Sequence, residues 1–147
     1  MTQQADLASP APPEMVIDAL SAPFWAAARQ RRLELQRCQD CGLFIHFPRP
    51  VCRRCGSFRL EFEPVSGRGS VYSYTETRRA FHPFFADRVP YLLASIELAE
   101  QADLRMLSNL VGIAEPDVRF GMPVEVTFED LSPDLTIPVF VPAGSPA

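Results

Sequence analysis

Two short stretches of sequence decide the fold of this chain: CQDCG at residues 38–42 and CRRCG at residues 52–56. Each is a Cys-x2-Cys pair followed by glycine, which lets the backbone turn tightly so that its N–H groups point at the sulfur atoms. Two such pairs at short separation place four thiolates tetrahedrally around one zinc ion. The sequence therefore predicts a rubredoxin-like zinc ribbon over about residues 33–63, with these four zinc ligands: Cys38, Cys41, Cys52 and Cys55.

The predicted zinc site is structural, because four cysteine ligands leave no open coordination position for water or substrate. Two disulfides or four free thiols are the alternatives. The N-terminus lacks the basic region and apolar run of a secretory signal peptide, which predicts a cytoplasmic, reducing environment and disfavours disulfides. His46 lies between the two pairs and is expected to be a surface or packing residue rather than a ligand.

Charge is divided unevenly along the chain. Every basic side chain is arginine, and residues 29–59 carry eight arginines against Glu34 and Asp40. Residues 60–147 are acidic, which argues against a non-specific nucleic-acid binder, since such a protein presents a basic groove. No stretch approaches the ~20 apolar residues that cross a bilayer, so no membrane association is expected.

One helix is predicted near the N-terminus. It is expected to run from about Ser21, as its cap, to Arg32, with Pro23 in the first turn. Trp25 on this helix either packs in the core against the ribbon or forms an aromatic wall beside a ligand or partner.

Short runs of alternating or β-branched residues predict the remaining elements as strands. Three belong to the ribbon, at residues 33–37, 43–47 and 59–64. Five follow a break at Ser66–Gly69, and they are expected at residues 70–78, 91–98, 104–112, 123–129 and 136–141. Five strands with a small insertion between the third and fourth match the OB-fold, a partly open Greek-key barrel. Pro138 inside the last run indicates an edge or bulge position.

The predicted fold is thus mainly β. The expected division is a flexible tail at residues 1–13, the helix and ribbon at residues 14–64, the barrel at residues 65–142, and a second tail at residues 143–147.

Several motifs in a fixed order give the chain a family resemblance. It resembles the bacterial and archaeal zinc-ribbon/OB-fold proteins long catalogued as a domain of unknown function, over about residues 21–142. One departure is the stretch RQRR at residues 29–32, where such proteins often carry glycine and acidic residues. The motifs that carry the resemblance are PFWAAARQRRLELQRC (23–38), FPRPVCRRCGS (47–57), SGRGSVYSYT (66–75), HPFF (82–85), VPYLLASIEL (89–98), LRMLSNLVG (104–112) and FGMPVEVTFED (120–130).

This resemblance implies an accessory role in acyl-CoA chemistry. Such proteins resemble partners of thiolase-like enzymes, including steroid side-chain aldolases, and of MaoC-type enoyl-CoA hydratases. The implied role is to dock beside a catalytic subunit, complete its active-site entrance and help hold the CoA thioester. Independently of the resemblance, no acid or nucleophile lies at a suggestive spacing to either histidine, so no catalytic residue is predicted in this chain.

Arginines and aromatic residues are the candidates for contacts with CoA or a partner. Guanidinium groups complement the phosphates of CoA, and aromatic side chains could line the path of its acyl or pantetheine arm. His82 lies on the longest loop of the barrel and could donate a hydrogen bond to a thioester, although packing among aromatics is the simpler interpretation. With Trp25 and His82, the candidates are Arg53, Arg54, Arg78, Arg79, Phe81, Phe84 and Phe85.

Two other functions compete with the accessory role. A single-stranded nucleic-acid-binding module is suggested by the combination of ribbon and OB-fold, with Tyr72 and Tyr74 available to stack on bases. A stand-alone hydrolase or lyase is ranked last, because no nucleophile and base occur at a suggestive spacing.

Overall fold

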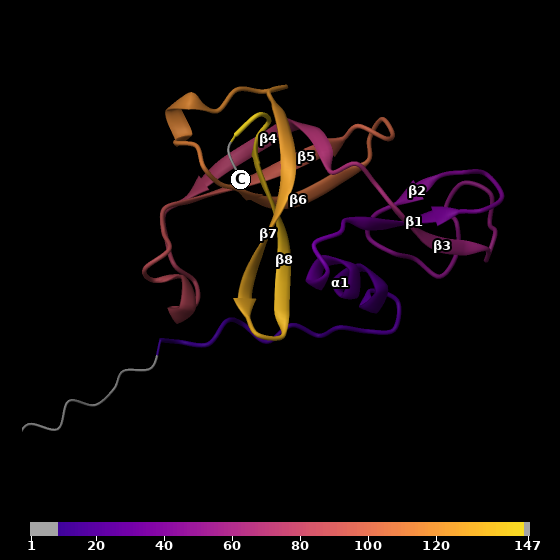
Figure 1. The fold of residues 1–147 in the computed structure, drawn as a ribbon, viewed down its shortest axis with the longest axis horizontal. Helices are drawn as coiled ribbons and strands as arrows, with labels where there is room; N and C mark the ends of the chain where they lie inside the picture. Colours follow the sequence, from indigo (N-terminus) through magenta and orange to yellow (C-terminus); the bar gives the residue numbers. More distant parts are fainter. Residues whose placement is uncertain (1–8, 146–147) are drawn as a thin grey trace, which may run out of the picture.

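The chain forms a small three-stranded sheet and a closed five-stranded barrel (Figure 1). Our computed structural model describes residues 9–145. The ribbon sheet has the order β2-β1-β3 and the barrel the order β4-β5-β6-β8-β7, so the predicted mainly β fold with an N-terminal helix, a ribbon and a five-stranded OB-fold barrel is confirmed. The elements are α1 (Ala22–Arg29), β1 (Glu34–Cys38), β2 (Phe44–Ile45), β3 (Leu60–Pro64), β4 (Arg68–Thr77), the 3-10 turn η1 (Pro83–Phe85), β5 (Tyr91–Leu98), β6 (Arg105–Leu110), η2 (Glu115–Asp117), β7 (Pro123–Ser132) and β8 (Leu135–Pro142).

Helix α1 is shorter than predicted, and Ser21 occupies the predicted N-cap position without a side-chain capping hydrogen bond. The Ser21 hydroxyl donates to Asp18 Oδ1 at 2.7 Å instead of capping the helix, because this nearby carboxylate competes for it. The helix ends at Arg29, since Arg31 adopts a left-handed conformation with φ 59° and the Arg32 N–H bonds back to the Ala27 carbonyl. The prediction that the helix reaches Arg32 is therefore wrong by one turn.

Strands β7 and β8 extend beyond their predicted ends into a long hairpin. They pair from Val124 with Pro142 to Ser132 with Leu135, and α1 packs against β8. The extra length gives the helix a surface to bury against.

Pro138 lies inside β8 and pairs with Phe128 of β7. Its carbonyl points toward β6 and accepts a hydrogen bond from Ser108 Oγ at 2.8 Å. Strands β6 and β8 pair only at Leu110 and Phe140, so the missing N–H of Pro138 interrupts no ladder bond there.

The break predicted around residues 66–69 coincides with the start of the first barrel strand. Gly69 pairs with Leu98 in the barrel, and a Cβ at this position would lie 2.5 Å from the Glu97 carbonyl oxygen. Only glycine therefore permits this close approach of β4 to β5.

The helix, one side of the ribbon and the barrel share a core. Phe24 of α1 and Leu35 of β1 belong to the same buried cluster as barrel residues such as Ile96 and Phe140. Trp25 is half-buried and packs against this cluster, which agrees with the core interpretation of its role. A second, smaller cluster surrounds the cysteines and contains Cys38, Leu43, Ile45 and Cys52.

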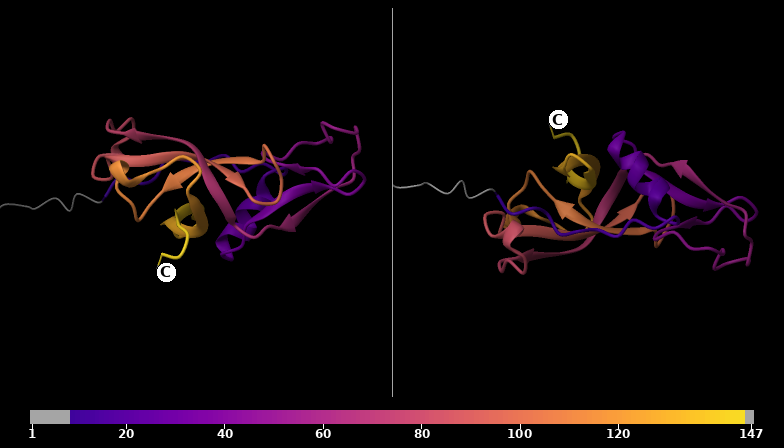
Figure 2. Two further views of the ribbon diagram at one scale, coloured as in Figure 1. Left: turned by 90° about the horizontal axis from the view of Figure 1, so that it is seen from above. Right: turned by 90° about the horizontal axis from the view of Figure 1, so that it is seen from below.

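The ribbon and the loop that carries η1 lie at opposite ends of the molecule (Figures 1 and 2). Residues 1–8 of the predicted N-terminal tail lie outside the described residues, and residues 9–13 contain neither helix nor strand. In the described part of the chain, no helix is long and apolar enough to cross a membrane. The proposed division at residues 64 and 65 remains a prediction.

Candidate metal centre and barrel pocket

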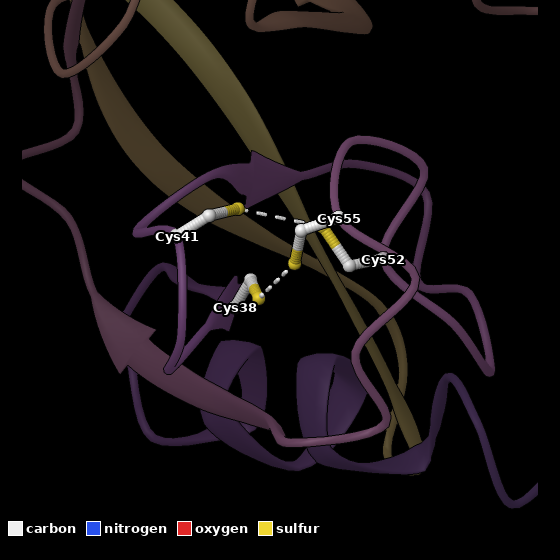
Figure 3. Close-up of side chains that lie close together, drawn as sticks. All are labelled: Cys38, Cys41, Cys52 and Cys55. Atoms are coloured by element: carbon white, nitrogen blue, oxygen red, sulfur yellow. Dashed lines mark hydrogen bonds between the residues drawn. The ribbon is translucent and has the colours of Figure 1, made fainter.

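The four cysteine sulfurs point toward one another at the tip of the ribbon (Figure 3). All four sulfurs lie within 4.8 Å of one another, and the pairs Cys38–Cys55 and Cys41–Cys52 have S···S distances of 3.6 Å. These distances are far too long for a disulfide, in which the sulfurs are about 2.05 Å apart. Around a tetrahedral zinc ion with Zn–S bonds of about 2.3 Å, sulfurs would be about 3.8 Å apart, so the arrangement fits zinc.

The two Cys-x2-Cys-Gly stretches fold in the same way. Gly42 and Gly56 have φ of 75° and 74°, and their N–H groups donate to the Cys38 and Cys52 carbonyls at 2.9 Å. This left-handed turn is accessible to glycine at little cost. The Arg54 N–H points at Cys52 Sγ at 3.4 Å, as the sequence pattern predicts.

The surroundings of the cysteines lower the pKa of two thiols and raise the pKa of a third. Backbone N–H groups, first that of Cys41, lower the pKa of Cys38 to about 6, and the N–H of Cys55 lowers the pKa of Cys52. The Ser57 N–H acts to lower the pKa of Cys55, but desolvation and the neighbouring thiols together raise it to about 12. Four thiolates so close together repel one another, and a divalent cation removes that repulsion. The donor set therefore suits a structural zinc ion.

His46 lies outside this cluster and packs as a neutral ring. Its imidazole stacks on Phe47 at 4.3 Å and lies 5.5 Å from the Phe24 ring. Burial lowers the pKa of His46 to about 4, and Nδ1 has no hydrogen-bond partner among the described residues. Its expected packing role agrees with this position.

The basic charge of the ribbon region is only partly neutralised. Arg53 and Arg54 are exposed in the second Cys-x2-Cys pair and form no ion pair within the described part of the chain. Four other arginines are paired, in the contacts Arg31–Asp130, Arg32–Glu34, Arg37–Glu63 and Arg59–Asp40.

The other candidates gather on what we call the aromatic loop, residues 78–90. Phe84 and Phe85 meet edge to face at 5.1 Å, and Phe85 lies 5.7 Å from Tyr91. Phe81 is exposed, and the Arg79 guanidinium lies 5.6 Å from its ring. The structure therefore brings the candidates at residues 78–85 together. Arg53 and Arg54 belong to the ribbon segment, which lies at the opposite end of the molecule from this loop (Figures 1 and 2).

His82 has a defined orientation on this loop. Its Nδ1 accepts a hydrogen bond from the Phe84 N–H at 3.1 Å, which caps η1. The proton of the neutral imidazole is then on Nε2, which can donate to a carbonyl. This geometry is compatible with both interpretations of His82.

A cavity of about 660 Å³ lies where the aromatic loop meets the barrel; we call it the barrel pocket. Phe85 and Arg88 contribute to it from the loop, and residues 109–116 contribute from the end of β6 and the segment that follows. Of the candidate residues, Phe85 lines this pocket. Trp25 instead lines a smaller hollow of about 210 Å³ between α1 and the β7–β8 turn.

Sequence reasoning missed two residues that position these sites. Arg88 pairs with Glu129 at 2.8 Å and covers the Phe84 ring at 4.2 Å, so it fixes the aromatic loop to β7. Gln101 clamps the ribbon to the barrel, because its amide accepts from the Phe44 N–H at 2.9 Å and donates to the Phe44 carbonyl at 3.2 Å. Both partners are distant in sequence, so no local pattern could have revealed them.

The two tyrosines considered for base stacking differ in position. Tyr74 packs against the core and lies 5.5 Å from Phe120. Tyr72 is exposed, with the Arg105 guanidinium 3.5 Å from its ring centre.

A tetracysteine ribbon joined to a closed five-stranded barrel defines a zinc-ribbon/OB-fold protein. Family comparison agrees: residues 25–61 match the rubredoxin-like zinc ribbon domain of ChsH2, and residues 62–129 match the ChsH2 C-terminal OB-fold domain. The chain belongs to this ChsH2/DUF35 family.

Three similar proteins extend the comparison. A solved chain described as "Ltp2-ChsH2(DUF35) aldolase" is 42% identical with a TM-score of 0.80, over 88% of this chain and 99% of that one. A benzoylsuccinyl-CoA thiolase subunit BbsA from Thauera aromatica is 33% identical over 75% of this chain and 71% of its own length. A probable enoyl-CoA hydratase alpha subunit from Thermomonospora curvata is 42% identical over 89% of this chain, which spans only 40% of that relative.

Proposed function

We propose that this chain is a non-catalytic accessory subunit that binds acyl-CoA and docks onto a thiolase-like enzyme, a thiolase or an acyl-CoA aldolase, to complete its active site. The observation that carries this proposal is the near-complete coverage of the solved "Ltp2-ChsH2(DUF35) aldolase" chain, at 42% identity. The thiolase subunit BbsA supports it independently. In this role the four-cysteine site keeps the ribbon folded and takes no part in chemistry.

The aromatic loop is the part of the chain best suited to meet acyl-CoA. Arg78 and Arg79 are exposed and can pair with phosphates, and His82 has an Nε2–H available for a thioester carbonyl. The exposed ring of Phe81 adds apolar surface for a partner or for the pantetheine arm. Arg53 and Arg54 belong to the ribbon, at the opposite end of the molecule from this loop, so in this proposal they do not serve the same ligand site.

Co-expression with a thiolase-like protein encoded by a neighbouring gene tests the docking role. We expect the two proteins to co-elute in size-exclusion chromatography and the enzyme to gain activity. Separate elution with unchanged enzyme activity would contradict the proposal.

Two exposed phenylalanines provide a matched pair of variants. Phe81 is 82% exposed and Phe58 81% exposed, but the first lies on the aromatic loop and the second in the ribbon region. If the aromatic loop meets the partner, Phe81→Ala weakens the complex and Phe58→Ala leaves it unchanged. The reverse result would place the interface on the ribbon.

A MaoC-type hydratase partner is the second candidate, because a hydratase alpha subunit shares 42% identity with this chain. The matching part is 40% of that relative, so the hydratase activity belongs to a longer protein. Complex formation with a hydratase subunit in the same chromatographic assay, in place of the thiolase-like protein, would favour this alternative.

A further inference from the structure

The barrel pocket has the dimensions of a small-molecule site. Its volume of about 660 Å³ falls within the roughly 300–1,000 Å³ of typical ligand pockets. The walls are mainly apolar, with Leu92 and Leu110 from the barrel strands and Ile113 from the segment after β6. Phe85 and Tyr91 add aromatic surface. An apolar group can therefore be removed from water here.

The charged groups around this pocket are predominantly acidic. Glu76, Glu115 and Glu129 line it, and Arg88 is the guanidinium among the lining residues. Arg88 is already paired with Glu129, and Glu76 is paired with Arg78. Glu115 forms no ion pair within the described residues, so its charge is uncompensated. An anion that enters the pocket meets net repulsion.

We infer that the barrel pocket binds an uncharged, apolar acyl or aryl group and disfavours carboxylates and phosphates. The identification of that group as the acyl part of a CoA thioester rests on the proposed function. A thioester is neutral, whereas the free acid is charged, so the acidic lining distinguishes the two. The phosphates of CoA would then lie outside the pocket, where Arg78 and Arg79 are exposed.

The aromatic loop forms one wall of the pocket through Phe85 and Arg88. Arg88 connects the loop to β7 by its ion pair with Glu129, and both side chains are partly exposed. Such a surface pair contributes little free energy. The loop is therefore also held by the packing of Phe85 against Tyr91 at the start of β5, which keeps this wall of the pocket in place.

Two probes of equal size test the charge preference. 4-Phenylbutan-2-one is neutral, and 3-phenylpropanoate replaces its methyl group with a carboxylate oxygen. Titration of the isotope-labelled full chain, followed by amide chemical shifts, reports both affinity and location. We expect millimolar binding of the ketone with shifts at residues 109–116, and binding of the carboxylate weaker by about fivefold, or about 1 kcal/mol.

A matched pair of substitutions tests the location. Ala114 is exposed and lines the pocket, whereas Ala102 is exposed in the turn between β5 and β6, outside it. We expect Ala114→Trp to weaken ketone binding by at least about tenfold and Ala102→Trp to leave it unchanged. In Glu115→Gln, the preference for the ketone is expected to fall to about twofold, because the uncompensated charge is gone.

The outcomes separate this inference from the proposed function. Absence of ketone binding, shifts outside residues 109–116, or equal affinity for the two probes would overturn the inference, whatever the partner assay shows. Because the shifts of the unsubstituted protein locate the ligand, the test survives if Ala114→Trp does not fold. Conversely, ketone binding together with failure to bind a thiolase-like enzyme would support the pocket and contradict the docking role.

Discussion

The ribbon and the barrel bury very different amounts of apolar surface. Around the cysteines the buried cluster contains Leu43 and Ile45 besides Cys38 and Cys52, whereas the barrel core includes many large side chains with Phe140 fully buried at its centre. A domain of about thirty residues has too little core to fold without help. The comparison teaches that the ribbon tip depends on metal and that the barrel depends on hydrophobic packing.

Loss of the metal site is expected to have the largest effect. Zinc contributes about 10–16 kcal/mol of apparent free energy to small domains, so Cys52→Ser or strong chelation should unfold the ribbon and abolish partner binding. Amide hydrogen exchange should show lost protection in β1 and β2 but retained protection in β5 and β6. Phe58→Ala, three residues after the second cysteine pair and outside the cluster, is the control. Full partner binding by Cys52→Ser would contradict a structural role for the metal.

Truncation in the barrel core is expected to rank second. Phe140→Ala removes a fully buried side chain and should lower the free energy of unfolding by about 3–5 kcal/mol. Denaturant unfolding measures this change. Leu107→Ala, on the exposed face of β6, should change it by less than about 0.5 kcal/mol. A loss of zinc stoichiometry in Phe140→Ala would show that the two regions are less independent than proposed.

The partly buried His46 should make stability depend on pH. The pKa of His46 is lowered from 6.5 to about 4 in the folded protein, so the unfolded chain binds the proton more readily. The stability of the neutral ring is fully present above pH 6.5 and is lost as the pH falls toward 4, by up to roughly 3 kcal/mol. His46→Phe should flatten this part of the profile, and His82→Gln should retain it. Identical pH profiles for His46→Phe and the unsubstituted protein between pH 6.5 and 5 would contradict the burial argument.

The junction between the two regions is expected to show the smallest effect. Gln101→Ala removes both amide contacts with the Phe44 backbone and should cost about 1–3 kcal/mol. Hydrogen exchange should become faster at Phe44 while the centre of the barrel stays protected. Ala102→Ser, the next residue in the turn, is the control. Unchanged exchange at Phe44 would show that the shared core, rather than Gln101, holds the ribbon in place.

Local sequence patterns were sufficient to predict the strands and the four metal ligands. Alternation predicted the barrel strands to within a few residues, and the spacing of the cysteines predicted their convergence. The end of α1 was missed, because Arg31 takes a left-handed conformation that its side chain does not signal. The extra length of β7 and β8 was missed because it reflects contact with α1, a tertiary effect.

By itself, then, the sequence determined the zinc ribbon, the five barrel strands and the family to which the chain belongs. The spacing of the cysteines and the periodicity of the apolar residues are local properties of the sequence. Only the tertiary structure decided that Arg53 and Arg54 lie far from Arg78 and Arg79, that Gln101 joins the ribbon to the barrel, and that an acid-lined pocket forms beside Phe85. These features depend on strand register and on how the loops pack. They join residues that are distant along the chain, which no local pattern specifies.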